Sequence, residues 1–199
     1  MIVDTHLLIS QILYKHISKG TNFKLNRLAF AYGNIKPDFT NKDIKSAHTL
    51  EESLHNVTKY SEELMGKNIS NKEFSISLGV TCHFICDYFC LYHREGNEKK
   101  AAYEHFFYEL ILHVKLIILL LKGKINLSNH ELFENNVEKL VLALQKKYNS
   151  ETKSLTRDIN NALIAASQIS NLIVCSSQLL IQQNETNISK AYLLSHKNS

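Results

Sequence analysis

The chain has 199 residues, of which 44% are hydrophobic, and it contains only six glycines and one proline. β-Sandwiches and barrels need turn residues roughly every 8–12 positions, so this composition excludes them, together with low-complexity chains. The formal net charge is +4, and the basic residues are scattered along the sequence. Such scatter does not form the basic stripe of a duplex-binding protein, and no dedicated nucleic-acid groove is predicted.

Apolar residues recur with helical spacing along almost the whole chain, which predicts an all-α fold. Helices are predicted over residues 5–19, 44–65, 70–92, 98–122, 129–148 and 151–182. No composition shift or repeat marks a boundary, so residues 1–199 are expected to form one compact multi-helix domain, with a frayed tail over 184–199. The oligomeric state is left open.

The predicted helices have recognisable starts and one long interruption. Residues 22–43 contain the only proline, Pro37, and are predicted to be irregular, with an extended path over Ile35–Asp38 because a residue before proline disfavours helix. Capping boxes at Ser70–Glu73 and Ser128–Glu131 are expected to begin two of the helices.

The longest apolar run, Leu110–Leu121, is shorter than the roughly 20 residues of a membrane span. It is therefore predicted to be a buried helix, with Phe106 and Phe107 as further core residues. The N-terminal segment has neither a basic region nor a small-residue cleavage site typical of a signal peptide. A cytoplasmic location without a transmembrane segment is expected.

Three of the four cysteines, Cys82, Cys86 and Cys90, recur every four residues on one stripe of the predicted helix 70–92. A secreted disulfide scaffold would spread its cysteines, so free thiols in a reducing compartment are expected. We interpret the stripe as small buried packing residues, with thiolate metal ligands as the alternative.

Two neighbouring predicted helices each carry a histidine and a carboxylate four residues apart. These pairs are His83 with Asp87 and His105 with Glu109, and His93 lies between them. Side chains four residues apart share one helical face. Zinc takes imidazole nitrogen and carboxylate oxygen in this mixture, so the pattern predicts a metal centre.

The pattern His-x3-Asp-x5-His-x11-His-x3-Glu over residues 83–109 resembles the signature of the bacterial zinc-dependent phospholipases C. The segment Tyr-Gly-Asn-Ile-Lys-Pro-Asp that ends at Asp38, together with His48 and His6, resembles further parts of that family's metal site. The resemblance implies a zinc-dependent phosphodiester hydrolase in which a metal-activated water attacks the phosphodiester. A phospholipid is one candidate substrate.

The same resemblance implies two or three zinc ions per chain. The first would be held by Asp38, His48, His83 and Asp87, the second by His93, His105 and Glu109, and the third by Asp87, His6 and the amino group of Met1. Asp38 is also the residue chosen to orient or deprotonate the attacking water. His113, four residues beyond Glu109, is an alternative ligand.

Two features leave alternative functions open. The spacing of Met1 and His6 resembles the zinc-dependent single-strand nucleases, which share this fold, so a nuclease or nucleotidase is one alternative. Phe39 matches the aromatic that follows the aspartate ligand in choline-specific phospholipases and is expected to contact substrate, but Lys45 replaces their second aromatic. A non-enzymatic metal-binding protein is the other alternative.

Overall fold

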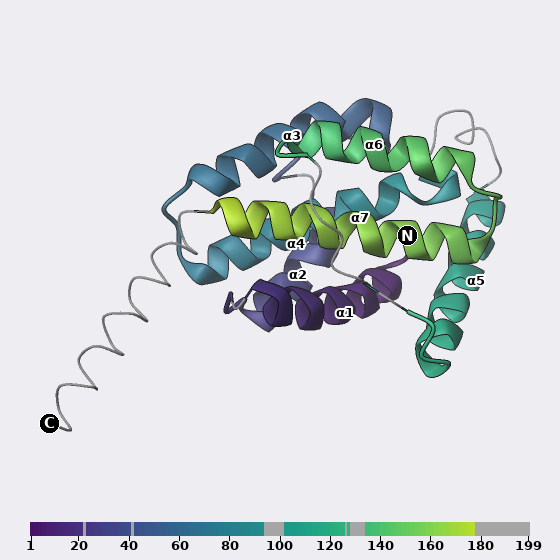
Figure 1. Cartoon of the computed structure of the whole chain (residues 1–199). Coiled ribbons are helices and arrows are strands. Elements are labelled where there is room, and N and C mark those ends of the chain that lie inside the picture. The colour runs from purple at the N-terminus through teal and green to yellow at the C-terminus, as the bar shows by residue number, and fades with distance from the viewer. Residues whose placement is uncertain (22, 41, 94–101, 126, 128–133, 178–199) are drawn as a thin grey trace, which may run out of the picture.

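The computed structural model describes the whole chain except residues 22, 41, 94–101, 126, 128–133 and 178–199. The described residues form α-helices and one short 3-10 helix, and no strand occurs among them, which confirms the predicted all-α fold (Figure 1). The elements are α1 (Val3–Thr21), α2 (Arg27–Phe39), α3 (Leu50–Gly66), α4 (Asn71–Tyr88), η1 (Leu91–His93), α5 (Ala102–Leu121), α6 (Val137–Ser150) and α7 (Leu155–Ser176).

Helix α4 lies at the centre of the molecule, where it packs against α2, α3 and α7. Every residue of α4 from Leu78 to Tyr88 is buried, as expected of a helix covered by neighbours on all sides. The predicted capping box begins it: the Ser70 hydroxyl accepts from the Glu73 N–H at 3.2 Å, and the Glu73 carboxylate accepts from the Ser70 N–H at 3.0 Å. Residues His83 and Asp87 are therefore held inside the protein, on its most enclosed helix.

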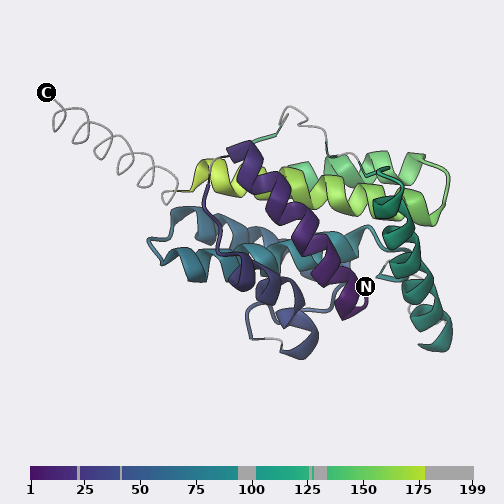
Figure 2. The same ribbon diagram turned by 90° about the horizontal axis from the view of Figure 1, so that it is seen from below.

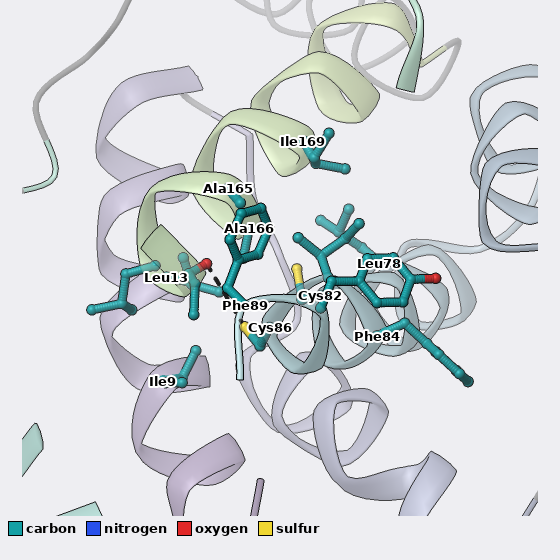
Figure 3. Close-up of a cluster of buried hydrophobic side chains, with 14 of the residues drawn as sticks. Ile9, Leu13, Leu78, Cys82, Phe84, Cys86, Phe89, Ala165, Ala166 and Ile169 are labelled. Atoms are coloured by element: carbon teal, nitrogen blue, oxygen red, sulfur yellow. Dashed lines mark hydrogen bonds between the residues drawn. The ribbon is translucent and has the colours of Figure 1, made fainter. Parts of the chain in front are cut away.

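Helix α7 covers one side of α4 through small side chains. Cys82 and Cys86 point from α4 toward α7, where Ala165 and Ala166 lie against them (Figure 3). The Cys82 sulfur lies 3.0 Å from the Ser170 hydroxyl. Because these two cysteines face α7 from within the core, the packing interpretation is confirmed for them.

The segment predicted to be irregular contains a helix, α2, and that prediction is wrong. The Asn26 side chain caps the helix by accepting from the Ala29 N–H at 3.0 Å. Pro37 lies in the last turn of α2, and its ring nitrogen has no hydrogen to donate toward the preceding turn. The helix ends two residues later, so the proline costs little there, and Asp38 lies on helical rather than extended backbone.

Helix α2 packs on α4 with its backbone in direct contact. A Cβ atom added to Gly33 would lie 2.1 Å from the carbonyl oxygen of Ile76, and one added to Gly79 would lie 2.4 Å from the carbonyl oxygen of Phe30. Only glycine leaves room for such an approach. The pair Gly33 and Gly79 therefore sets the distance between α2 and α4.

Several helix boundaries differ from their predicted positions. Helix α3 begins at Leu50 rather than 44, and α6 begins at Val137, where the Asn136 side chain accepts from the Lys139 N–H. Helix α7 begins at Leu155 behind Ser154 as its cap, not at 151. The predicted Ser128–Glu131 capping box and the tail over 184–199 lie outside the described residues.

Helix α5 is not the buried helix that its apolar sequence predicted. Leu112, Leu116 and Leu119 are buried, but Phe106 and Phe107 are 55% and 56% exposed. The helix stands at one edge of the molecule in both views (Figures 1 and 2). Among the described helices, none has the length and apolar character to cross a membrane.

Candidate metal centre

His83 and Asp87 occupy the inner end of the site, and both are fully buried on α4. The His83 Nδ1 lies 2.8 Å from the carbonyl oxygen of Asn34 on α2. A carbonyl oxygen only accepts, so Nδ1 carries the proton and Nε2 carries a lone pair. The close contact of α2 with α4 thus fixes the imidazole tautomer that a metal ion requires.

The lone pair of His83 faces further nitrogen and oxygen atoms that can bind a metal ion. Its Nε2 lies 3.2 Å from Nδ1 of His48, 3.3 Å from Oδ2 of Asp87 and 3.7 Å from Oδ1 of Asp38. Burial lowers the pKa of His83 well below its usual range, which favours the neutral ring. Imidazole nitrogens and carboxylate oxygens that converge in this way fit a cation held between them.

Asp87 connects the parts of the site. Its Oδ1 lies 2.7 Å from the Met1 amino nitrogen and 3.3 Å from His6 Nε2, while Oδ2 lies 3.1 Å from His48 Nδ1. Burial by itself would raise the pKa of Asp87, but the neighbouring His93, Met1 amino group and His6 lower it well below its usual range. Asp87 is therefore an ionised carboxylate within the protein interior.

His6 is fully buried, and its ring stacks on that of His83 with 4.0 Å between ring centroids. Neither ring nitrogen makes a hydrogen bond, although Nε2 lies within ion-pair distance of Asp87. A buried imidazole without hydrogen bonds is costly in free energy. Coordination of a metal ion through one nitrogen would remove part of that cost, so His6 fits a ligand.

A second set of ligands comes from η1 and α5. Oε1 of Glu109 lies 3.0 Å from His93 Nε2 and 2.8 Å from His105 Nε2. Burial opposes ionisation of Glu109, but its hydrogen bond with His93 and the Met1 amino group lower its pKa to about 2. The Cys90 sulfur belongs to the same cluster as His93 and Glu109, with ligand atoms all within 4.8 Å of one another.

The amino group of Met1 lies between the two sets. Its nitrogen is 2.7 Å from Asp87, 3.1 Å from Glu109 and 3.0 Å from His93 Nε2. Burial disfavours the charged amine, but Asp87, Cys90 and Glu109 outweigh that effect and raise its pKa to about 11. An amine binds a metal ion through its lone pair, so coordination at this position would release a proton.

Asp38 and Phe39 lie at the solvent-exposed edge of the metal centre, in the last turn of α2. Burial raises the pKa of Asp38, although nearby His6 acts in the opposite direction. Phe39 is 68% exposed. The alternative ligand His113 lies apart from the ligand clusters that the described residues form, and its Nδ1 is 3.1 Å from the Thr5 hydroxyl.

A buried polar network holds α5 against α7. The Tyr108 and Tyr148 hydroxyls donate to the two carboxylate oxygens of Asp158, and Arg157 donates to the same carboxylate at 2.7 Å. The Tyr108 hydroxyl also accepts from the Leu91 N–H at 3.3 Å. This network positions both α5 and η1, which carry the second set of ligands.

The structure brings together the eight side chains of the three predicted ligand sets, but not the alternative ligand His113. The eight are His6, Asp38, His48, His83, Asp87, His93, His105 and Glu109. Sequence reasoning missed the Asn34 carbonyl, because a backbone acceptor carries no sequence signal. For Cys90 both interpretations from the sequence stay open: its side chain is buried in the hydrophobic core, and its sulfur also lies in the cluster with His93 and Glu109. Four overlapping groups among the described residues could each hold a metal ion.

Comparison with known proteins identifies a family for this chain. The model of a family described as zinc-dependent phospholipase C matches residues 5–174, which is most of the chain. No curated protein and no solved structure matches this chain.

Proposed function

The chain belongs to the zinc-dependent phospholipase C family, and on that premise we propose that it is a zinc-dependent phosphodiester hydrolase. The observation that supports this proposal best is the buried convergence of imidazole nitrogens and the Met1 amino group on the carboxylate of Asp87. Such a mixture of nitrogen and oxygen ligands suits zinc.

We propose that the ligands divide into three sets, of which the first and the third share Asp87. Asp38, His48, His83 and Asp87 would form the first, His93, His105 and Glu109 the second, and Asp87, His6 and the Met1 amino group the third. Asp87 has both carboxylate oxygens engaged by these neighbours, so it can serve two sets. When bound, zinc supplies a positive field for the phosphodiester oxygens and lowers the pKa of a coordinated water.

Asp38 is our candidate for the residue that orients the attacking water and takes up its proton. Its side chain is 20% exposed, whereas that of Asp87 is fully buried and enclosed by histidines and the amino group. Because burial raises the pKa of Asp38, its carboxylate holds a proton more readily than an exposed aspartate does. Phe39, which follows it at the exposed end of α2, would contact the bound substrate.

The first experiment measures zinc content and hydrolysis of bis-p-nitrophenyl phosphate by the purified protein. Wild type should bind two or three zinc ions and lose activity with chelator. Asp38→Asn should retain most of its zinc and lose activity by about a hundredfold, a typical effect of removing a general base. A zinc-loaded wild type that hydrolyses no phosphodiester would favour the non-enzymatic alternative, and preference for single-stranded DNA over phosphatidylcholine would favour the nuclease.

The ligand assignment is tested by melting temperature with and without chelator. Zinc binds the folded form alone, so it should stabilise wild type by mass action. Cys86→Ala should keep the same zinc-dependent increase, because Cys86 packs against α7 in the core. His83→Ala should lose most of it, and an unchanged response to chelator in His83→Ala would refute the assignment.

A further inference from the structure

Helix α5 presents a long row of apolar side chains to solvent. Nine of them are between 38% and 83% exposed: Tyr103, Phe106, Phe107, Leu110, Ile111, Val114, Ile117, Ile118 and Leu121. At 3.6 residues per turn these positions form one continuous face, about 140° wide and about 27 Å long. No charged residue falls within it. Exposed apolar surfaces of this extent mark interaction sites rather than ordinary solvent-facing surface.

Basic residues border this apolar face. By helical spacing, Lys115 and Lys122 lie along one border, and Lys124 follows just beyond the helix. Lys153 lines a cavity of about 290 Å³ with Ile111 at the same border. Glu104 is the one acidic residue on that border of α5. The charge around the face is therefore predominantly positive.

The apolar face of α5 is a convex surface at the outside of the molecule and not a groove. Helix α5 stands at the outside of the helical bundle in both overall views, with its buried side toward α7 (Figures 1 and 2). A single partner helix covers a narrower stripe than this face provides. A layer of lipid chains, into which a helix can sink, can cover such a convex face along its whole length and width.

The same helix carries two residues of the metal centre. His105 and Glu109 lie on the side of α5 that faces η1 and the amino group of Met1. They belong to the first eight residues of the helix, at the same end as Tyr103 and Phe106, but by helical spacing they lie on the side of α5 away from the exposed face. A surface bound by α5 would therefore lie about one helix diameter, roughly 10 Å, from the second set of ligands.

We propose that the apolar face of α5 docks this protein on the surface of an anionic phospholipid bilayer. The apolar side chains would enter the interfacial region while the bordering lysines contact anionic headgroups, the two contributions that govern binding of interfacial helices. The proposal rests on the proposed function only in that docking would deliver phospholipid to the metal centre. Docking itself requires no hydrolysis.

The experiment is co-sedimentation of the full chain with vesicles of phosphatidylcholine alone and with about one third phosphatidylserine. Wild type should bind the anionic vesicles more tightly, and salt should weaken that binding. The double variant Val114→Gln/Leu121→Gln should bind at least about tenfold more weakly, because each position loses buried apolar surface. The matched control is Leu142→Gln/Leu28→Gln, which changes residues of nearly equal exposure on α6 and α2: 47% and 81%, against 48% and 83%.

Retention of vesicle binding in the control together with its loss in the α5 variant supports the proposal. Equal binding by the two double variants overturns it, and so does a wild type that binds neither kind of vesicle. A dimer in solution that dissociates in the α5 variant, without vesicle binding, assigns the face to a second copy and also overturns it. Hydrolysis of soluble bis-p-nitrophenyl phosphate should be equal in wild type and the α5 variant, so failure of the proposed function is read separately.

Discussion

His83 is placed so that its two ring nitrogens have opposite roles. Nδ1 donates to the Asn34 carbonyl, and Nε2 faces Asp87, Asp38 and His48. A second proton would place a positive charge on a fully buried ring that stacks on His6, and the neighbouring Asp87 offsets that cost only in part. The pKa of His83 is therefore lowered by burial and, secondarily, by His6. The chemistry of this residue depends on a backbone atom of another helix.

This burial predicts how the stability of the metal-free protein depends on pH. Below about pH 6.5 an unfolded histidine binds a proton, whereas His83 in the folded protein stays neutral. The unfolded state then binds more protons, so stability falls on acidification, by up to about 1.4 kcal/mol per pH unit for this group. Asp87, whose pKa is lowered, adds a further loss of the same sign at lower pH.

Urea unfolding of chelator-treated protein at pH 7.5, 6.5 and 5.5 measures this dependence. His83→Gln should show a shallower loss of stability on acidification, and the exposed-residue control His55→Gln should follow wild type. Stability that stays constant or rises between pH 6.5 and 5.5 would contradict the explanation.

At the scale of elements, the contact between α2 and α4 sets the geometry of the first set of ligands. Gly33 and Gly79 let the two backbones meet, and this contact places the Asn34 carbonyl against His83 and brings Asp38 to the same site. The sequence predicted α4 well, because its capping box and spacing are local signals. It missed α2, because Pro37 is a strong local signal against helix, whereas the packing that stabilises α2 comes from residues far along the chain.

Gly33→Ala should therefore destabilise the protein by about 2 kcal/mol or more, since a methyl group would meet the Ile76 carbonyl and force the helices apart. It should also weaken zinc binding, because Asn34 and Asp38 would move with α2. Gly66→Ala is the matched control: no atom lies within 4 Å of the added Cβ, so stability should change by less than about 1 kcal/mol. Denaturant unfolding and zinc titration of both variants check this, and equal effects would argue against a special role for the contact.

The same contrast between local and distant information applies to α5. Its apolar run was assigned to the core because hydrophobicity alone does not say which face of a helix has a partner. In the structure only the side with Leu112, Leu116 and Leu119 is covered. The ligand pairs His83 with Asp87 and His105 with Glu109 were readable because each lies within one helical turn. Their joint placement depends on the Tyr108–Asp158 contact, which joins residues 50 positions apart.

At the scale of the whole molecule, the fold brings the first residue of the sequence to its centre. Met1 is 4% exposed, and its amino nitrogen contacts Asp87 on α4 and Glu109 on α5. These contacts join Asp87 of the first set of ligands to Glu109 of the second set. A positive charge at that point balances two buried carboxylates, and removing one partner of a buried ion pair is strongly destabilising.

A peptide added before Met1 tests this arrangement, because it converts the amino group into an uncharged amide and needs space that the buried site does not provide. Such an N-terminal extension should lower the melting temperature, release about one zinc ion per chain and reduce phosphodiesterase activity. Proteolytic removal that regenerates the free Met1 amino group should restore all three properties. A C-terminal extension of the same length is the control and should change none of them. If the N-terminal extension leaves zinc content and rate unchanged, the centre holds two ions, and His6 acts as a buried neighbour of His83 and not as a ligand.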